Sequence, residues 1–261
     1  MAAKKYTGII VLGHGTRDLW GQLEFLRFVA ALRLRLIRQG QWLPWQVRPA
    51  FLELVLPDLQ SAVQELYAAS VNNVIVLPMF LASAGHMKID VPKLIYRASQ
   101  RYPGMRFALL PALGDEEAVA VALVNRIREG KSGKDLIKSG VIVVCRGSTD
   151  QGAIENARLM AARVAPRLNV KMTIAASLVG SGPDLNDALL TMVENEILDI
   201  IVVPYLLFHG LLLASLKDRI EQFLHYHDTV SIHLASHLGI QGSLLQLALK
   251  RLENHNREVF S

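Results

Sequence analysis

In Gly8-Ile-Ile-Val-Leu-Gly-His-Gly-Thr-Arg-Asp18, an apolar run leads directly into a loop of glycines and polar residues. The run does not alternate between apolar and polar residues, which is typical of a strand buried on both faces of a parallel sheet. The polar end of the stretch recurs 132 residues later, where Gly147-Ser-Thr-Asp150 corresponds to Gly15-Thr-Arg-Asp18. This recurrence indicates that the chain contains the same strand and loop twice.

Further landmarks repeat in the same order along the chain. They are Pro57-Asp-Leu59 with Pro183-Asp-Leu185 and Val76-Leu-Pro78 with Val202-Val-Pro204, both at an offset of 126, and Leu113-Gly114 with Leu238-Gly239 at 125. Nearly constant offsets indicate a duplicated unit of about 125 to 130 residues. Residues 129–140 form a polar, glycine-containing linker. We therefore predict an N-terminal domain at 1–130 that carries the catalytic residues, and a similar C-terminal domain at 140–261.

Strand-like and helix-like segments alternate in both halves. The apolar runs are 8–12, 46–52, 73–79, 106–110, 141–145, 172–176 and 199–205, and segments with helical spacing are 20–38, 57–70, 115–128, 153–164 and 183–194. Alternation of this kind is typical of an α/β fold with a parallel sheet covered by helices on both faces. The sequence predicts two similar domains, each with a parallel four-stranded sheet and about four flanking helices.

Composition and charge exclude several classes of protein. The chain has 261 residues, of which 51% are apolar and 20% charged, as in ordinary globular proteins. A net charge of +5 without a concentrated basic run favours an anionic small molecule over nucleic acid as the partner. The single cysteine, Cys145, cannot form an internal disulfide, and we expect a cytoplasmic protein. The apolar segment 200–216 is interrupted by Pro204 and Gly210, which argues against a membrane span.

Three loops of the first half carry groups that can bind a metal or move a proton. His14, Glu53 and His86 each follow a predicted strand. Because the carboxyl ends of parallel strands lie at one edge of the sheet, the three side chains can converge there. Two imidazoles and a carboxylate suit iron, cobalt, nickel or zinc, and leave coordination positions open for a substrate.

Each of these residues also has a purely structural interpretation. His14 could be a turn residue, Glu53 a charge at a helix entry, and His86 a helix cap. The second half separates the two interpretations, since Arg146, Val179 and Leu212 stand at the corresponding positions. The glycine, proline and aspartate landmarks persist in both halves, so they indicate scaffold. The residues unique to the first half indicate function.

Other motifs point less clearly to chemistry. Gly13-His-Gly-Thr16 lacks the lysine of a phosphate-binding P-loop, and no dinucleotide fingerprint opens a helix after a strand. Cys145 at a strand end is most simply a small buried residue. His209 is the best candidate ligand in the second half, and the sequence leaves its participation open.

Taken together, the motifs resemble those of the two-domain class II chelatases. The residues that carry the resemblance are His14-Gly-Thr-Arg17, Phe51-Leu-Glu-Leu54, the segment 78–92, Arg146-Gly-Ser-Thr-Asp150 and the segment 204–210. These chelatases are the sirohydrochlorin cobaltochelatases and ferrochelatases of cobalamin and sirohaem synthesis. The resemblance implies a lyase with a cleft between its domains, which inserts a divalent metal into a tetrapyrrole with loss of two protons.

The resemblance also implies roles for individual residues. His14 and His86 match the metal-binding histidines, His14 also matches the proton acceptor, and Glu53 matches the acidic active-site residue. The loop that would contact the substrate consists of Leu81, Ala82, Ser83, Ala84, Gly85 and His86. One departure is His209, where the family pattern leads us to expect a small hydroxyl residue.

The expected partners follow from this chemistry. Sirohydrochlorin carries many peripheral carboxylates, and the basic residues in or just after the loops are Arg17, Lys88, Lys93, Arg97 and Arg146. The metal, Co²⁺, Fe²⁺ or Ni²⁺, is a substrate, and we expect no organic cofactor, no nucleic acid and no membrane partner. A chain that contains both domains is expected to be a monomer.

The same ligands serve all three metals, so the metal and the pathway, cobalamin or sirohaem, stay open. A non-catalytic metal- or tetrapyrrole-binding module and a histidine-dependent phosphotransfer enzyme are the alternatives.

Overall fold

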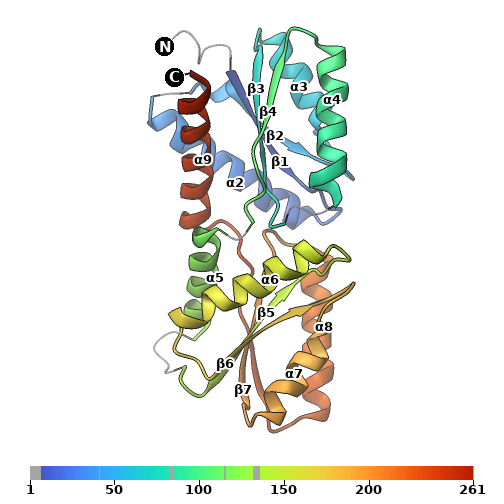
Figure 1. The fold of residues 1–261 in the computed structure, drawn as a ribbon, viewed down its shortest axis with the longest axis vertical. Coiled ribbons are helices and arrows are strands. Elements are labelled where there is room, and N and C mark those ends of the chain that lie inside the picture. The colour runs from blue at the N-terminus through green and yellow to red at the C-terminus, as the bar shows by residue number, and fades with distance from the viewer. Residues whose placement is uncertain (1–6, 41, 83–84, 115, 132–135, 261) are drawn as a thin grey trace. The chain divides into compact units, whose positions relative to one another are not determined.

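The computed structural model describes residues 7–40, 42–82, 85–114, 116–131 and 136–260 (Figure 1). The chain forms two compact units, Met1–Gly114 with Gly242–Ser261 and Asp115–Gln241. Each unit contains one four-stranded parallel sheet flanked by helices. The predicted α/β class with two similar domains is thus confirmed.

The sheet of the first unit has the strand order β2-β1-β3-β4, and all neighbouring strands are parallel. Its strands are β1 (Thr7–Gly13), β2 (Val47–Phe51), β3 (Asn73–Pro78) and β4 (Arg106–Leu109), and its helices are α2 (Leu19–Arg38), α3 (Leu59–Ala68), α4 (Val91–Arg101) and α9 (Gly242–Phe260). The short helices η1 (Pro44–Gln46) and η2 (His86–Asp90) precede β2 and α4. β1 lies between two strands and is buried along its whole length, which accounts for its unbroken apolar run.

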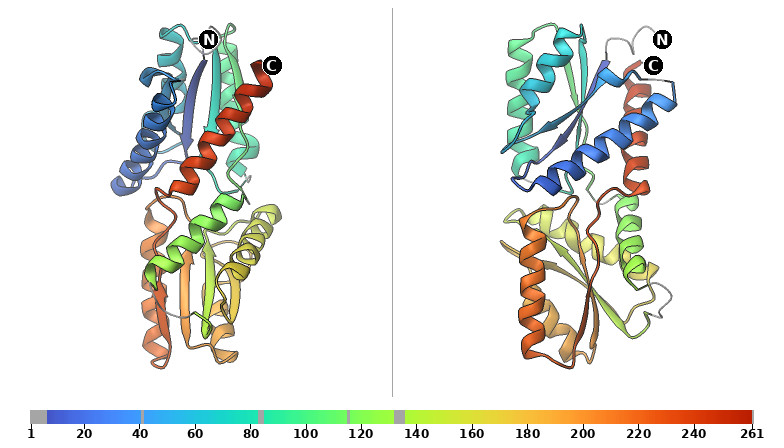
Figure 2. Two further views of the ribbon diagram at one scale, coloured as in Figure 1. Left: turned by 90° about the vertical axis from the view of Figure 1, so that its left-hand side faces the viewer. Right: turned by 180° about the vertical axis from the view of Figure 1, so that it is seen from behind.

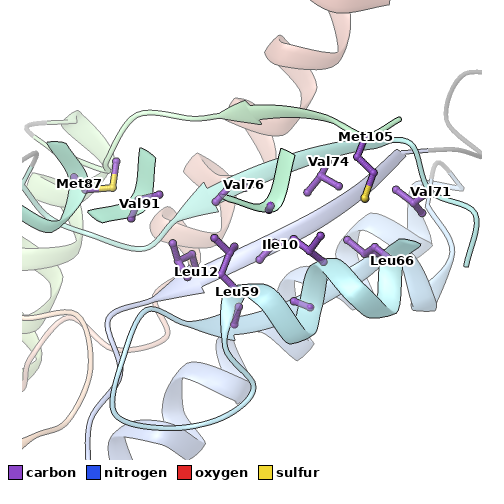
Figure 3. Packing of buried hydrophobic residues seen from close by; sticks show 14 of the residues in the cluster. Ile10, Leu12, Leu59, Leu66, Val71, Val74, Val76, Met87, Val91 and Met105 are labelled. Atoms are coloured by element: carbon purple, nitrogen blue, oxygen red, sulfur yellow. The ribbon is translucent and has the colours of Figure 1, made fainter. Parts of the chain in front are cut away.

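The core of this unit lies between the sheet and its helices. Ile10 and Leu12 of β1 pack with Leu59 and Leu66 of α3, and Val76 of β3 belongs to the same cluster (Figure 3). All five side chains are at most 2% exposed. This packing fixes the sheet and thereby the positions at which its strands end.

The second unit repeats this arrangement. Its sheet has the order β6-β5-β7-β8, again entirely parallel. The strands are β5 (Ser139–Cys145), β6 (Met172–Ser177), β7 (Asp199–Pro204) and β8 (Ser231–Leu234), and the helices are α5 (Glu117–Gly130), α6 (Gln151–Val164), the short η3 (Ala165–Arg167), α7 (Leu185–Glu194) and α8 (Leu211–Tyr226). The two sheets therefore share one topology, as the sequence repeat predicts.

The compact units differ from the predicted domains 1–130 and 140–261 in their last helices. The chain's final helix, α9, contacts α2 and β3 of the first unit (Figure 2), where Nη1 of Arg251 donates to the carbonyl oxygen of Ala112 at 2.7 Å. Helix α5, at the end of the first sequence half, instead packs on α6 and β7 and buries Leu123 and Ile127 there. Each sequence half thus supplies the last helix of the other half's unit.

Among the residues that the structure describes, no helix is both long and apolar enough to cross a membrane.

Asp184 caps the start of α7, and its contribution to stability depends on pH. Its Oδ1 accepts a hydrogen bond from the backbone N–H of Asn186 at 2.8 Å, and the guanidinium of Arg219 contacts the same carboxylate. The hydrogen bond from Arg219 is the main reason why the pKa of Asp184 lies below its usual value. The ionised carboxylate of Asp184 therefore contributes its full stabilisation above a pH of about 3.9, the pKa of an aspartate in the unfolded chain. This contribution is lost as the pH falls through the lower pKa that the group has in the folded state.

We expect Asp184→Ala to lower the free energy of unfolding at pH 7 by about 1 to 2 kcal/mol, the usual cost of losing a helix N-cap. Urea unfolding at pH 7 and at pH 3 measures the effect, which should shrink at the lower pH. The matched control is Asp228→Ala, an exposed aspartate of the same unit. Equal destabilisation by both substitutions would contradict this role of Asp184.

Candidate metal and proton-transfer site

The sequence-predicted residues of the first half lie in loops that follow three neighbouring strands of the first sheet. His14 follows β1 directly, Glu53 follows β2, and η2 (His86–Asp90) comes after β3. Both β2 and β3 pair with β1 in parallel, so the three strands end side by side. The topology therefore brings the three loops together, as expected for a parallel sheet.

Backbone hydrogen bonds hold the His14 and Glu53 loops together beyond the strand ends. The N–H of Leu52 donates to the carbonyl oxygen of Gly13 at 2.8 Å, and the N–H of Glu53 donates to that of His14 at 3.1 Å. Gly15 has a φ of +99°, and a Cβ atom at this position would lie 2.0 Å from the carbonyl oxygen of Glu53. Only glycine allows so close an approach of the two backbones.

As a result, the side chains of His14 and Glu53 meet. Nδ1 of His14 lies 3.6 Å from Oε1 of Glu53 and 3.3 Å from the carbonyl oxygen of Gly15. Both neighbours of Nδ1 are acceptors, which favours the tautomer that carries its proton there and leaves the lone pair on Nε2. The side chains of His14 and Glu53 are 33% and 43% exposed, whereas Nε2 of His14 is itself buried.

The loop after β3 is described only in part. The backbone of His86 opens η2, but its side chain lies outside the described part of the structure, as do Ser83 and Ala84. The predicted convergence of His86 with His14 and Glu53 therefore stays a prediction. Among the side chains that the structure describes, no group of three histidine, cysteine, aspartate or glutamate residues is placed to hold a metal ion.

The remaining predicted substrate-binding residues are accessible to differing degrees. Leu81 and Ala82 are half-buried, whereas Gly85 is exposed. The basic residues Arg17, Lys88 and Arg146 are exposed as well. Their charged groups can therefore reach an anionic ligand.

The second unit contains the same pair of loops with different side chains. Gly147 has a φ of +94°, and a Cβ atom there would lie 1.6 Å from the carbonyl oxygen of Val179. The N–H of Val179 donates to the carbonyl oxygen of Arg146 at 2.9 Å, as that of Glu53 does to His14. Arg146 and Val179 thus occupy the places of His14 and Glu53, which matches the predicted correspondence. The loop scaffold is shared, and the imidazole–carboxylate pair belongs to the first unit.

A second histidine accompanies His209 in the C-terminal unit, and the sequence pattern did not point to it. The ring centroids of His209 and His237 are 6.2 Å apart. His237 follows β8, one residue before Leu238-Gly239. The sequence repeat could have pointed to His237, because Ala112 stands at the corresponding position of the first half and the histidine is therefore unique to the second half.

A comparison with protein-family models shows which family the chain belongs to. The CbiX family model matches residues 8–130 and 140–255, which together make up most of the chain. The chain belongs to the CbiX family. The two matched ranges agree with the duplicated unit that the sequence repeat predicts.

Individual relatives extend over nearly the whole chain. A sirohydrochlorin ferrochelatase of Bacillus subtilis (strain 168) is 25% identical over 244 residues, covering 94% of this chain and 90% of the relative. A sirohydrochlorin cobaltochelatase of Priestia megaterium is 25% identical over 250 residues, covering 94% and 78%. The solved structure described as SirB from Bacillus subtilis with Fe³⁺ is 25% identical, has a TM-score of 0.82 and covers 97% of each chain. The resemblance to class II chelatases is thus confirmed.

Proposed function

We propose that this chain is a sirohydrochlorin chelatase, a lyase that inserts a divalent metal into the tetrapyrrole. The pairing of His14 with Glu53 at 3.6 Å, on the scaffold of the CbiX family, is the observation that carries this proposal. Relatives named as ferrochelatases and as a cobaltochelatase support both Fe²⁺ and Co²⁺ as metal substrates. The metal is a substrate, and the proposed reaction needs no organic cofactor.

The reaction requires groups that accept protons. One M²⁺ ion replaces the two pyrrole N–H protons of the macrocycle, so two protons leave for each metal inserted. Neutral imidazole accepts a proton or holds the entering cation, and a partly exposed carboxylate passes protons to water. We assign these tasks to His14 and Glu53, with His86 as the second metal ligand. Imidazole and carboxylate ligands bind Fe²⁺ and Co²⁺ less permanently than a set of thiolate ligands would.

The anionic substrate also requires cations that pair with its carboxylates. Arg17, Lys88 and Arg146 are exposed and can pair with the peripheral carboxylates of sirohydrochlorin. A guanidinium stays protonated, so Arg146 neither binds metal nor accepts a pyrrole proton. We assign it to holding the substrate, and we assign the segment 81–86 to contacting the macrocycle. In this proposal the chain acts as a monomer in the cytoplasm.

The two alternatives differ from a chelatase in measurable ways. A phosphotransfer enzyme would need cations around His14, whereas the carboxylate of Glu53 lies beside it and would repel a phosphoryl group. A binding module would yield no more than one metallated product per chain. Incubating sirohydrochlorin and Co²⁺ or Fe²⁺ with a hundredth of an equivalent of the protein separates catalysis from storage. Many products per chain in excess of a reaction without protein support the proposal, and one or fewer in excess refutes it.

We expect Glu53→Gln to lower the rate of metal insertion by about tenfold or more, because the amide keeps the shape but accepts no proton at neutral pH. The initial rate at saturating metal, followed by the absorbance of the metallated product, measures this effect. A suitable control is Glu65→Gln, which removes a carboxylate of similar exposure that pairs with Arg48 at 2.9 Å. If Glu53→Gln keeps the wild-type rate, Glu53 serves only as a structural residue of its loop.

A further inference from the structure

The carboxyl ends of β7 and β8 carry a histidine pair that the proposed reaction does not use. His209 lies in the loop between β7 and α8, and His237 lies in the loop after β8. Their ring centroids are 6.2 Å apart, and the ring planes meet at 71°. His209 is exposed and His237 is half-buried, so ions from solvent can reach the pair.

The two loops that carry these histidines are tied together by their backbones. The N–H of Leu238 donates to the carbonyl oxygen of Leu206 at 3.0 Å, and that of Gly239 donates to Leu207 at 2.8 Å. Leu238 directly follows His237, and Leu207 lies two residues before His209. These bonds therefore hold the two histidine-bearing loops close to each other.

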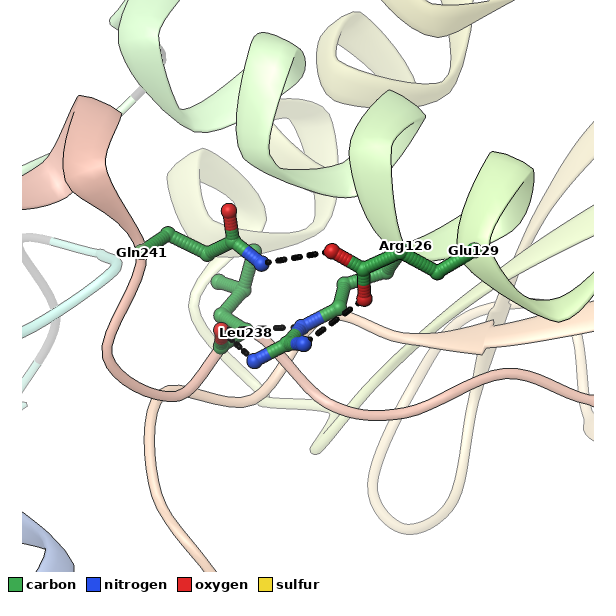
Figure 4. Close-up of polar contacts among 4 residues, drawn as sticks. All are labelled: Arg126, Glu129, Leu238 and Gln241. Carbon is green, nitrogen blue, oxygen red and sulfur yellow. Dashed lines mark hydrogen bonds and ion pairs between the residues drawn. The ribbon is translucent and has the colours of Figure 1, made fainter.

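A half-buried arginine reinforces the His237 loop from helix α5. Nε and Nη2 of Arg126 both donate to the carbonyl oxygen of Leu238, at 3.2 and 2.9 Å (Figure 4). The Arg126 side chain is 20% exposed, its Nη1 pairs with Glu129 at 2.8 Å, and Gln241 contacts the same carboxylate. This network fixes the residue that directly follows His237.

The first unit shows that the backbone hydrogen bonds between these two loops do not require histidine. In the first unit the N–H of Leu113 donates to the carbonyl oxygen of Phe80 at 2.7 Å, which corresponds to the bond from Leu238 to Leu206. The positions of His209 and His237 are occupied there by Ser83 and Ala112. Both histidines are thus additions to a scaffold that forms without them.

We propose that His209 and His237 bind a first-row transition-metal dication of the Co²⁺ or Ni²⁺ class. Imidazole nitrogen suits these ions. With metal–nitrogen distances of about 2.0 to 2.1 Å, two imidazoles on one tetrahedral ion have ring centroids about 5 Å apart. The observed separation of 6.2 Å is about 1 Å longer than this distance.

The coordination is incomplete by protein groups alone. No third histidine, cysteine, aspartate or glutamate joins the pair among the side chains that the structure describes. Water or another exchangeable ligand fills the remaining positions, so the ion is bound weakly and exchanges with solvent. This property suits temporary holding of a metal rather than a permanent structural site.

Titration of the full-length protein with Co²⁺, without any tetrapyrrole, tests the proposal. The variants His209→Ser and His237→Ala introduce the residues of the first half, and His225→Ala removes an exposed histidine of the same unit as the control. We expect each single variant to weaken one Co²⁺ site by about tenfold or more, and the double variant to lose one equivalent of Co²⁺. His14→Ala and His225→Ala should leave this site unchanged.

Anomalous scattering from Co²⁺-soaked crystals gives a second measurement that does not depend on affinity. The proposal predicts a peak within ligand distance of both rings in the wild type and no such peak in the double variant. It is wrong if the double variant binds as much Co²⁺ as the wild type with equal affinity, or if the cobalt lies away from the two rings. Because no tetrapyrrole is present, this outcome is independent of whether the chain inserts metal.

Discussion

Replacing His14 with alanine lowers the initial rate of metal insertion by more than about tenfold, because a positioned acid–base group of this kind contributes at least that much. The variant removes the proposed metal ligand and proton acceptor, whose Nδ1 lies 3.6 Å from Oε1 of Glu53. His14 is 33% exposed in a loop, so its loss leaves the core intact. Initial rates with sirohydrochlorin at saturating Co²⁺, together with the thermal midpoint of unfolding, measure both effects. We expect His86→Ala to behave in the same way.

The matched control for these variants is His225→Ala, which removes an exposed histidine from the other unit. It should keep the wild-type rate. If His14→Ala also keeps that rate at saturating metal, His14 has no part in the chemistry.

Replacing Gly15 with alanine has the second large effect, which acts on stability and activity together. The added Cβ would lie 2.0 Å from the carbonyl oxygen of Glu53, a backbone atom that cannot move aside alone. The φ of +99° adds strain for any residue with a side chain. We expect a loss of about 2 to 4 kcal/mol in the free energy of unfolding, the range of severe single substitutions. Separation of Glu53 from His14 should also slow metal insertion by about tenfold or more.

Gly40→Ala serves as the control for backbone strain alone. Gly40 has a φ of +67°, but a Cβ there meets nothing within 4 Å. It should cost about 1 kcal/mol, the strain of a left-handed residue, and leave the rate unchanged. Equal effects of the two substitutions in urea unfolding would show that the contact with Glu53 is unimportant.

The central strands of both sheets could be predicted from the sequence because they are buried on both faces. The runs 73–79 and 141–145, for example, correspond to Asn73–Pro78 and to the end of Ser139–Cys145. The last strand, β8 (Ser231–Leu234), lies at the sheet edge and is partly exposed, so its Ser-Ile-His-Leu sequence lacks an apolar run. It was not among the predicted runs, and His237, which follows it, was missed for the same reason.

The exchange of α5 and α9 could not be predicted from hydrophobic periodicity. An amphipathic pattern shows which face of a helix is buried, but not which sheet covers that face. In α5 the apolar side chains of Val119, Leu123 and Ile127 are buried, but their spacing in the sequence does not name the sheet that buries them. The packing partner is decided by tertiary contacts, so the sequence repeat and the compact units end at different residues.

The meeting of His14 and Glu53 was predictable because both follow parallel strands, whose carboxyl ends share one edge. The close approach at Gly15 was not, since a glycine in the sequence does not reveal its φ or its neighbour. The sequence repeat also predicted that Arg146 and Val179 occupy the equivalent loop pair of the second unit, which lacks the imidazole–carboxylate pair.

The internal copy also provides the most direct test of where the chemistry lies. The double variant His14→Arg with Glu53→Val carries the side chains that the second unit accepts on the same loop pair. Its rate of Co²⁺ insertion into sirohydrochlorin is compared with the wild type after unfolding curves establish that both are folded. We expect a folded protein whose rate falls by about a hundredfold or more, towards the uncatalysed rate. A folded double variant that inserts Co²⁺ as fast as the wild type would contradict the assignment of metal and proton chemistry to His14 and Glu53.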